Sequence, residues 1–97
     1  MKGPTSDDLS RRIHKAASAL LESGAREVYL FGSAATGRAS PASDIDIAVS
    51  GLPPAQFFRA MSKAAIALGR PVDLVDLDED TPFTRYLRSE GELQRVG

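Results

Sequence analysis

Two short groups of residues, Gly32-Ser33 and Asp44-Ile45-Asp46, are the part of this sequence best suited to chemistry, and ten residues separate them. Asp44 and Asp46 are two positions apart, so on a β-strand their carboxylates leave the same face, about 6.6 Å apart along the strand. Carboxylates placed in this way repel each other, which raises the pKa of at least one of them. A divalent cation bound between them removes that repulsion. The 97 residues contain no Cys and one His, so oxygen must hold any metal, and carboxylates suit Mg²⁺ or Mn²⁺.

Gly32-Ser33 supplies the group that complements the two carboxylates. The apolar run before it predicts a strand that turns through Gly32 into a short helix, with Ser33 as its N-cap. A helix N-terminus presents free backbone N–H groups to an anion, and glycine allows a phosphate to approach the backbone closely. Phosphate-binding groups beside metal-binding groups indicate a nucleoside triphosphate bound together with its metal ions. Two ions about 3.5–4 Å apart can hold the attacking and leaving oxygens of a phosphoryl displacement.

A third carboxylate is expected from another strand, and Asp73 and Asp76 are the two candidates. They are three positions apart, so they lie on opposite faces of the same strand. If Asp76 faced the metal ions, Asp73 would be buried unpaired among the helices, which is costly. If Asp73 faces the metal ions, Val72 and Leu74 enter the core and Asp76 lies near the strand end within reach of water. We therefore favour Asp73.

The elements that must position these residues follow from hydrophobic periodicity and from breakers. Helical spacing of apolar residues predicts a first helix capped by Thr5 and ended by Gly24, and a second helix with Phe57 or Phe58 turned inward. Strands are expected over 28–31, 44–49 and 72–77, and further helices over 34–36 and from Pro82 to about Gly91. The predicted fold is α/β, with α-β-α-β-α-β-α order around a small sheet of three strands. Residues 1–97 form one domain, of which 1–5 are expected to be a loose tail.

The composition excludes several classes of protein. Net charge is −1 with acidic and basic residues interspersed, so direct binding of nucleic acid is not expected. The N-terminus lacks the apolar run of a signal peptide, and no stretch reaches the roughly 18 apolar residues of a membrane span. A cytoplasmic protein that makes no membrane contact is the expectation.

The motifs resemble those of one known family. Phe31-Gly32-Ser33, then Asp44-Ile45-Asp46, then Val72-Asp73-Leu74-Val75 are similar to the minimal nucleotidyltransferases of the DNA polymerase β superfamily, over nearly the whole chain. The resemblance implies that Gly32 and Ser33 hold the triphosphate and that Asp44 and Asp46 bind two Mg²⁺ or Mn²⁺ ions. It also implies that Asp73 binds the catalytic metal and helps to deprotonate the attacking hydroxyl. The family often carries Arg in the short helix after Gly-Ser, whereas this chain has Ala34 and Thr36, and Arg38 is the nearest base that could replace that contact.

The same resemblance implies an activity and a partner. The expected reaction transfers a nucleoside monophosphate from a triphosphate to a hydroxyl, and ATP is the default donor because it is abundant. Bacterial members resemble the antitoxin half of two-gene modules, in which the enzyme adenylylates a tyrosine of a HEPN-type toxin. The alternative is a binding module without catalysis, which would neutralise its partner by contact alone.

Overall fold

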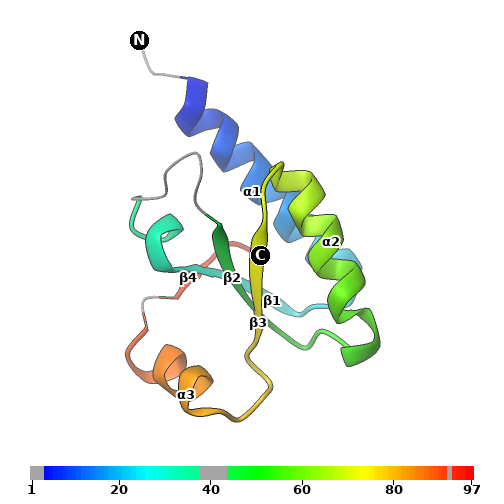
Figure 1. Cartoon of the computed structure of the whole chain (residues 1–97), viewed down its shortest axis with the longest axis vertical. Coiled ribbons are helices and arrows are strands. Elements are labelled where there is room, and N and C mark those ends of the chain that lie inside the picture. Colours follow the sequence, from blue (N-terminus) through cyan, green and yellow to red (C-terminus); the bar gives the residue numbers. More distant parts are fainter. Residues whose placement is uncertain (1–3, 38–43, 92) are drawn as a thin grey trace.

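The computed structural model describes residues 4–37, 44–91 and 93–97. Its elements in chain order are α1 (Pro4–Glu22), β1 (Glu27–Phe31), the 3₁₀ turn η1 (Gly32–Ala34), β2 (Ile45–Ser50), η2 (Pro54–Gln56), α2 (Phe57–Leu68), β3 (Val72–Asp76), α3 (Pro82–Ser89) and β4 (Gln94–Arg95). Figure 1 shows α1 and α2 side by side over the sheet and α3 apart from them. No helix among the described residues is both long enough and apolar enough to cross a bilayer.

The sheet is mixed and has the order β3-β2-β1-β4. β1 pairs antiparallel with β2 on one side and with β4 on the other, while β2 and β3 run parallel. α2 forms the crossover that a parallel pair requires. The α/β fold class expected from the sequence is confirmed, with one more strand than predicted.

Both faces of the sheet are covered, by different helices. The face under α1 and α2 carries the larger core, in which Ile45, Ile47 and Val49 are almost completely buried. On the opposite face, Ala48 belongs to a smaller buried cluster with Phe31, Leu77 and Leu87 of α3. Because Asp46 alternates with Ile45 and Ile47, it lies on the face that α3 only partly covers.

Some local predictions hold and others are corrected. The helix expected from Pro82 does begin there, as α3. Thr81 caps it: its hydroxyl accepts from the Thr84 N–H at 3.1 Å, and the Thr84 hydroxyl accepts from the Thr81 N–H at 3.0 Å. α1 begins at Pro4, inside the expected tail and before the predicted Thr5 cap, because proline is already shaped for a first helical turn. Residues 1–3 lie outside the described part of the chain. Phe57 rather than Phe58 packs against the core, and Phe58 is exposed.

The fourth strand, β4, was not predicted, and its composition explains why. β4 has two residues, Gln94 and Arg95, both exposed, so it shows no hydrophobic alternation. It forms because the unpaired edge of β1 offers backbone hydrogen-bonding groups. Gln94 pairs with Leu30, and Arg95 pairs with Tyr29.

Candidate active site

The parallel register of β2 and β3 brings two of the predicted carboxylates together. Asp46 is the direct partner of Asp73. Partners in a parallel pair project to the same face, so both carboxylates lie on the face opposite α1 and α2. Leu74 is buried in the main core and Val72 packs against it, while Asp76 lies at the strand end and accepts a hydrogen bond from the Asp78 N–H at 2.9 Å. The structure therefore places Asp73 beside Asp46 and leaves Asp76 at the strand end.

Asp46 is the electrostatic centre of the group. Burial raises the pKa of its carboxyl, the negative charges of Asp73 and then Asp44 raise it further, and a hydrogen bond to Asp73 that only the protonated acid can donate acts in the same direction. Asp44 immediately precedes β2 and is exposed. The mutual repulsion predicted for these carboxylates is therefore present, and it falls on the member that is least accessible to water.

The donor set suits a divalent ion, but the ligands are not gathered for one. Among residues 4–37, 44–91 and 93–97, no three Asp, Glu or His side chains are arranged as a ready metal site. The charges of Asp73 and Asp44 both act on the Asp46 carboxylate. A cation bound among them would cancel this repulsion, so these residues fit Mg²⁺ or Mn²⁺ chemically.

Gly32 allows the closest contact in this region. A Cβ added at this position would overlap Asp46 Oδ2 and lie 3.2 Å from Asp46 Cγ, and the residue has φ +68°. Both the backbone conformation and the approach of the carboxylate therefore require glycine. The turn between β1 and η1 and the carboxylate on β2 form one compact unit.

The structure corrects the predicted cap of the short helix. The helical turn is the 3₁₀ segment η1 (Gly32–Ala34), so Ser33 lies inside it, and no side chain caps it. The Ser33 carbonyl accepts a bond from the Thr36 hydroxyl at 3.2 Å. The first N–H groups of such a turn still have no acceptor within the helix, so they remain available to an anion.

A cleft of about 460 Å³ opens beside this turn. One wall comes from β1 and η1 and the other from α3, and the lining residues are Phe31, Gly32, Ser33, Thr36, Phe83, Tyr86, Leu87, Glu90 and Gly91. Phe83 and Tyr86 are about half exposed, and the Phe83 ring meets Phe31 edge to face with centroids 6.0 Å apart. No Lys or Arg belongs to this described lining.

Phe83 and Tyr86 were not predicted to belong to the site. Aromatic residues three apart on a helix share a face, which is a signal visible in the sequence. Nothing in the sequence shows that this face borders Gly32, because that contact depends on how α3 docks. Arg38, expected to contact the nucleotide, lies outside the described residues. Ala34, at a position where the family often has Arg, packs against the main core instead.

Comparison with known proteins identifies the family. Residues 16–93 match the family described as "Polymerase beta, Nucleotidyltransferase". The match covers most of the chain and includes the Gly-Ser turn, both strands with aspartates and α3. This chain belongs to the polymerase β-like nucleotidyltransferase family. Among curated proteins, none matches it significantly.

Solved structures with this fold include members of toxin–antitoxin complexes. A chain of a toxin–antitoxin complex with AMP-PNP is 31% identical with TM-score 0.69, over 86% of this chain and 70% of the other. A protein assigned as a minimal nucleotidyltransferase is 27% identical with TM-score 0.73, over 88% and 91% of the two chains. A chain from the complex of a tri-AMPylated Shewanella oneidensis HEPN toxin with its MNT antitoxin is 26% identical with TM-score 0.65, over 89% and 69%.

Proposed function

We propose that this protein transfers AMP from ATP to a hydroxyl group of a partner protein. The observation that carries the proposal is the register pair Asp46 and Asp73, which lies against the Gly32 turn at the edge of an open cleft. Membership of the nucleotidyltransferase family supports the reaction class. The toxin–antitoxin structure with AMP-PNP supports an adenine nucleotide as donor.

Each residue of the site has a distinct part in the proposed reaction. Asp44, Asp46 and Asp73 would hold two Mg²⁺ ions, which when bound neutralise the triphosphate and acidify the acceptor hydroxyl. The backbone N–H groups of Gly32 and Ser33 bind phosphate oxygens and orient the chain of phosphates. The acceptor oxygen forms a bond to the α-phosphorus as the bond to the bridging oxygen breaks and pyrophosphate leaves. The proton of the hydroxyl passes to the exposed carboxylate of Asp73.

We assign the nucleoside to the cleft between η1 and α3. Phe83 and Tyr86 offer partly exposed aromatic surface next to Ser33, and a nucleobase stacks on such surface. Phe83→Ala with Tyr86→Ala should raise the Kd for ATP and leave the Kd for inorganic tripolyphosphate unchanged, both measured with Mg²⁺. Equal weakening of the two ligands would count against a nucleoside in this cleft.

Label transfer tests the catalytic assignment. α-Labelled ATP, Mg²⁺ and the purified acceptor protein should give a labelled acceptor, and Asp44→Ala with Asp46→Ala should abolish the label. Asp76→Asn is the matched control, since it removes a carboxylate from the same strand as Asp73 but at a different face. If the double variant labels its acceptor as well as the parent does, the assignment is wrong.

The acceptor we propose is a tyrosine of a HEPN-type toxin, and the protein would then act as its antitoxin in the ATP-rich cytoplasm. The tri-AMPylated HEPN toxin bound to an MNT antitoxin supports this choice. A neighbouring gene for a short helical protein with an Arg-x₄-His motif would agree with it, and a solitary gene would count against it. Mass spectrometry of the acceptor, co-expressed with wild type, should place AMP on a tyrosine and not on Ser or Thr.

A contact-only antitoxin is the second candidate. It is favoured by Ala34 and Thr36, which stand where the family often carries Arg, since Ala34 packs against the main core and offers no charge. Co-expression separates the candidates, because Asp44→Ala should release the toxicity of the partner if transfer is required. Undiminished neutralisation by this variant would establish that contact is sufficient.

A further inference from the structure

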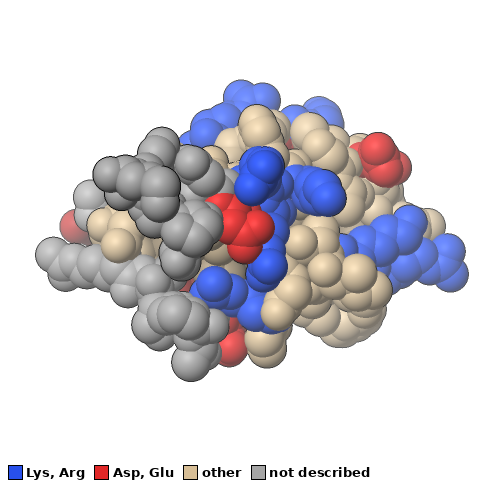
Figure 2. Space-filling model, turned by 90° about the horizontal axis from the view of Figure 1, so that it is seen from above, with Lys and Arg blue, Asp and Glu red and all other residues tan. Residues whose placement is uncertain are grey.

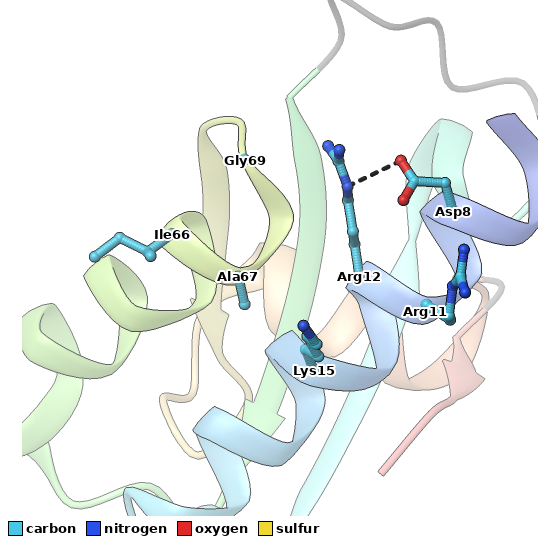
Figure 3. Close-up of a pocket in the computed structure, with 7 residues that line it drawn as sticks. All are labelled: Asp8, Arg11, Arg12, Lys15, Ile66, Ala67 and Gly69. Carbon is cyan, nitrogen blue, oxygen red and sulfur yellow. Dashed lines mark ion pairs between the residues drawn. The ribbon is translucent and has the colours of Figure 1, made fainter. Parts of the chain in front are cut away.

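A groove between α1 and α2 lies on the opposite side of the sheet from the carboxylates. It has a volume of about 450 Å³, and its lining residues are Asp8, Arg11, Arg12, Lys15, Ile66, Ala67 and Gly69. Figure 3 shows the basic side chains of Arg11, Arg12 and Lys15 along α1, with Ile66 and Ala67 on the neighbouring helix α2. Ile66 projects outward from α2 and is 81% exposed. The groove therefore combines positive charge with an accessible apolar side chain.

One of the basic residues holds the two helices together. The Arg12 guanidinium pairs with Asp8 at 3.0 Å and donates to the Leu68 carbonyl at the end of α2 at 3.3 Å. A cation at this position complements the negative end of the α2 dipole. Arg12 therefore holds α1 against the end of α2, and its guanidinium is not available to a ligand.

The other basic residues on these helices make no such contacts. Arg11 and Lys15 are exposed and form no hydrogen bond or ion pair with any residue that the structure describes. Lys63 precedes Ala67 by four positions and Arg59 precedes Lys63 by four, so both continue the same side of α2. They too are exposed and have no described partner. Unpaired positive charge therefore lines the α1 side of the groove, and two further exposed cations lie on α2 outside its lining.

The net charge of the whole chain does not show that basic residues are in excess on these two helices. The whole chain has 12 basic and 13 acidic residues, whereas α1 and α2 together hold five basic and three acidic ones. Viewed from the end where β2 and β3 begin, basic side chains lie on several sides of a small acidic patch (Figure 2). An acidic partner surface would be attracted to the helices and repelled by the carboxylates.

The groove also leads towards the candidate active site. Gly69 lines its end and is four residues from Asp73, a separation of no more than about 14 Å. The chain between them passes beside β2, since the Ile45 N–H donates to the Pro71 carbonyl at 3.1 Å. A polypeptide held in the groove can therefore present a neighbouring side chain to the edge of the sheet where Asp73 lies.

We propose that this groove binds an acidic, amphipathic helix of the acceptor protein. The inference rests on the proposed function, because it identifies the surface that holds the acceptor while its hydroxyl reacts. Acidic side chains of that helix pair with Arg11 and Lys15 in the groove, and those beyond the groove pair with Lys63 and Arg59 farther along α2. Its apolar side chains contact Ile66 and Ala67.

A protein helix fits this surface better than nucleic acid does. A phosphate backbone would use the cations but would gain nothing from Ile66, one of the most exposed large apolar side chains among the described residues. Apolar contact flanked by complementary charge is the usual composition of a groove that receives an amphipathic helix. The electrostatic part speeds association and selects acidic partners.

Peptide binding tests the proposal directly. The probe is a labelled helical peptide of about 18 residues, about 27 Å long, with Leu at i and i+4 positions and Glu beside them. Fluorescence anisotropy without metal or nucleotide should show binding to the wild type. Arg11→Gln with Lys15→Gln should raise its Kd at least about tenfold, equivalent to about 1.4 kcal/mol. Ile66→Asp, at an exposed position that does not support the core, should weaken binding as well.

Matched controls separate the groove from general charge. Arg85→Gln with Arg95→Gln also removes two exposed cations, but at α3 and β4, and should change the Kd less than about twofold. The same peptide with Lys in place of Glu, and a single-stranded RNA of similar length, should bind more weakly than the Glu peptide. Equal binding of the Glu and Lys peptides, tighter binding of RNA, or equal loss in both double variants would overturn the proposal.

A separate readout keeps this inference distinct from the proposed function. The thermal shift given by Mg²⁺ with α,β-methylene ATP, whose α–β bridge cannot be cleaved, should be the same in the wild type and in Arg11→Gln with Lys15→Gln. Loss of peptide binding with a retained shift supports the groove as acceptor surface. Loss of the shift in that variant would mean that the substitutions act on the nucleotide site, and the groove assignment would then fail.

Discussion

Gly32→Ala is expected to damage the stability of the domain and the nucleotide site together. An L-residue at φ +68° costs about 1–2 kcal/mol because its Cβ approaches the following carbonyl. At this position the Cβ also overlaps Asp46 Oδ2, so the carboxylate must leave its preferred rotamer at a further cost of about 0.5–1.5 kcal/mol. That movement takes Asp46 away from Asp73, with which it would share a metal ion.

Gly37→Ala is the matched control. Gly37 has φ +74°, nearly the same backbone conformation, but an added Cβ would meet no heavy atom within 4 Å. It therefore carries the conformational cost without the clash. Each kcal/mol lowers the melting temperature of a domain of this size by about 4–8 °C, so the two variants should be resolved by thermal melts.

The assay compares both variants with the wild type, with and without Mg²⁺ and α,β-methylene ATP. Gly32→Ala should melt several degrees below Gly37→Ala, and it alone should lose the shift produced by metal and nucleotide. If the two variants lose equal stability and keep equal shifts, the contact between Gly32 and Asp46 has no part in the site. The reasoning from close approach would then be refuted.

Three further predictions follow from the site. Asp46→Asn should stabilise the metal-free domain, and the gain should be larger at pH 7 than at pH 4. The pKa of Asp46 is raised in the folded state, so the stability that the protonated carboxyl contributes is lost as the pH rises, whereas Asn does not titrate. Urea denaturation in EDTA measures this, and a gain independent of pH would contradict it. Thr81→Ala should lower the free energy of unfolding by about 1 kcal/mol and weaken ATP binding, because α3 forms one wall of the cleft, while Ser89→Ala at its other end should do neither. Melts with Mg²⁺ alone, nucleotide alone and both should show a combined shift larger than the sum, and additive shifts would argue against a shared site.

The carboxylate pair could be predicted from the sequence because it depends on strand periodicity and burial. Asp46 alternates with Ile45 and Ile47, so one face had to be polar and the other apolar. The choice of Asp73 over Asp76 followed from the cost of burying an unpaired charge. The alternation of polar and apolar side chains along β2 and β3 is enough for both predictions.

The cleft could not be predicted because it depends on docking. α3 reaches the sheet through Leu87 and Ala48, residues far apart in the sequence that show no pairing pattern. In the sequence nothing distinguishes Ala48 from other strand residues. In the structure it is completely buried and helps to pack α3 against the second face. Since the second face is only partly covered, Asp46 remains half-buried beside an opening. The separation of positive charge onto α1 and α2 is likewise a product of the tertiary structure.

The unequal environments of the three carboxylates connect stability to function. Asp46 is the partly buried member, so desolvation and repulsion disfavour its charged form in the empty domain. Asp44 and Asp73 are exposed, and water already screens their charges. A divalent ion would therefore relieve the most repulsion at Asp46. An ion and a nucleotide that bind only the folded form stabilise it by mass action, about 2.7 kcal/mol at 100 times the dissociation constant. The feature that weakens the domain without metal is the one that would make it respond to a bound ion, and Gly32 preserves that feature by letting the Asp46 carboxylate lie against the turn η1.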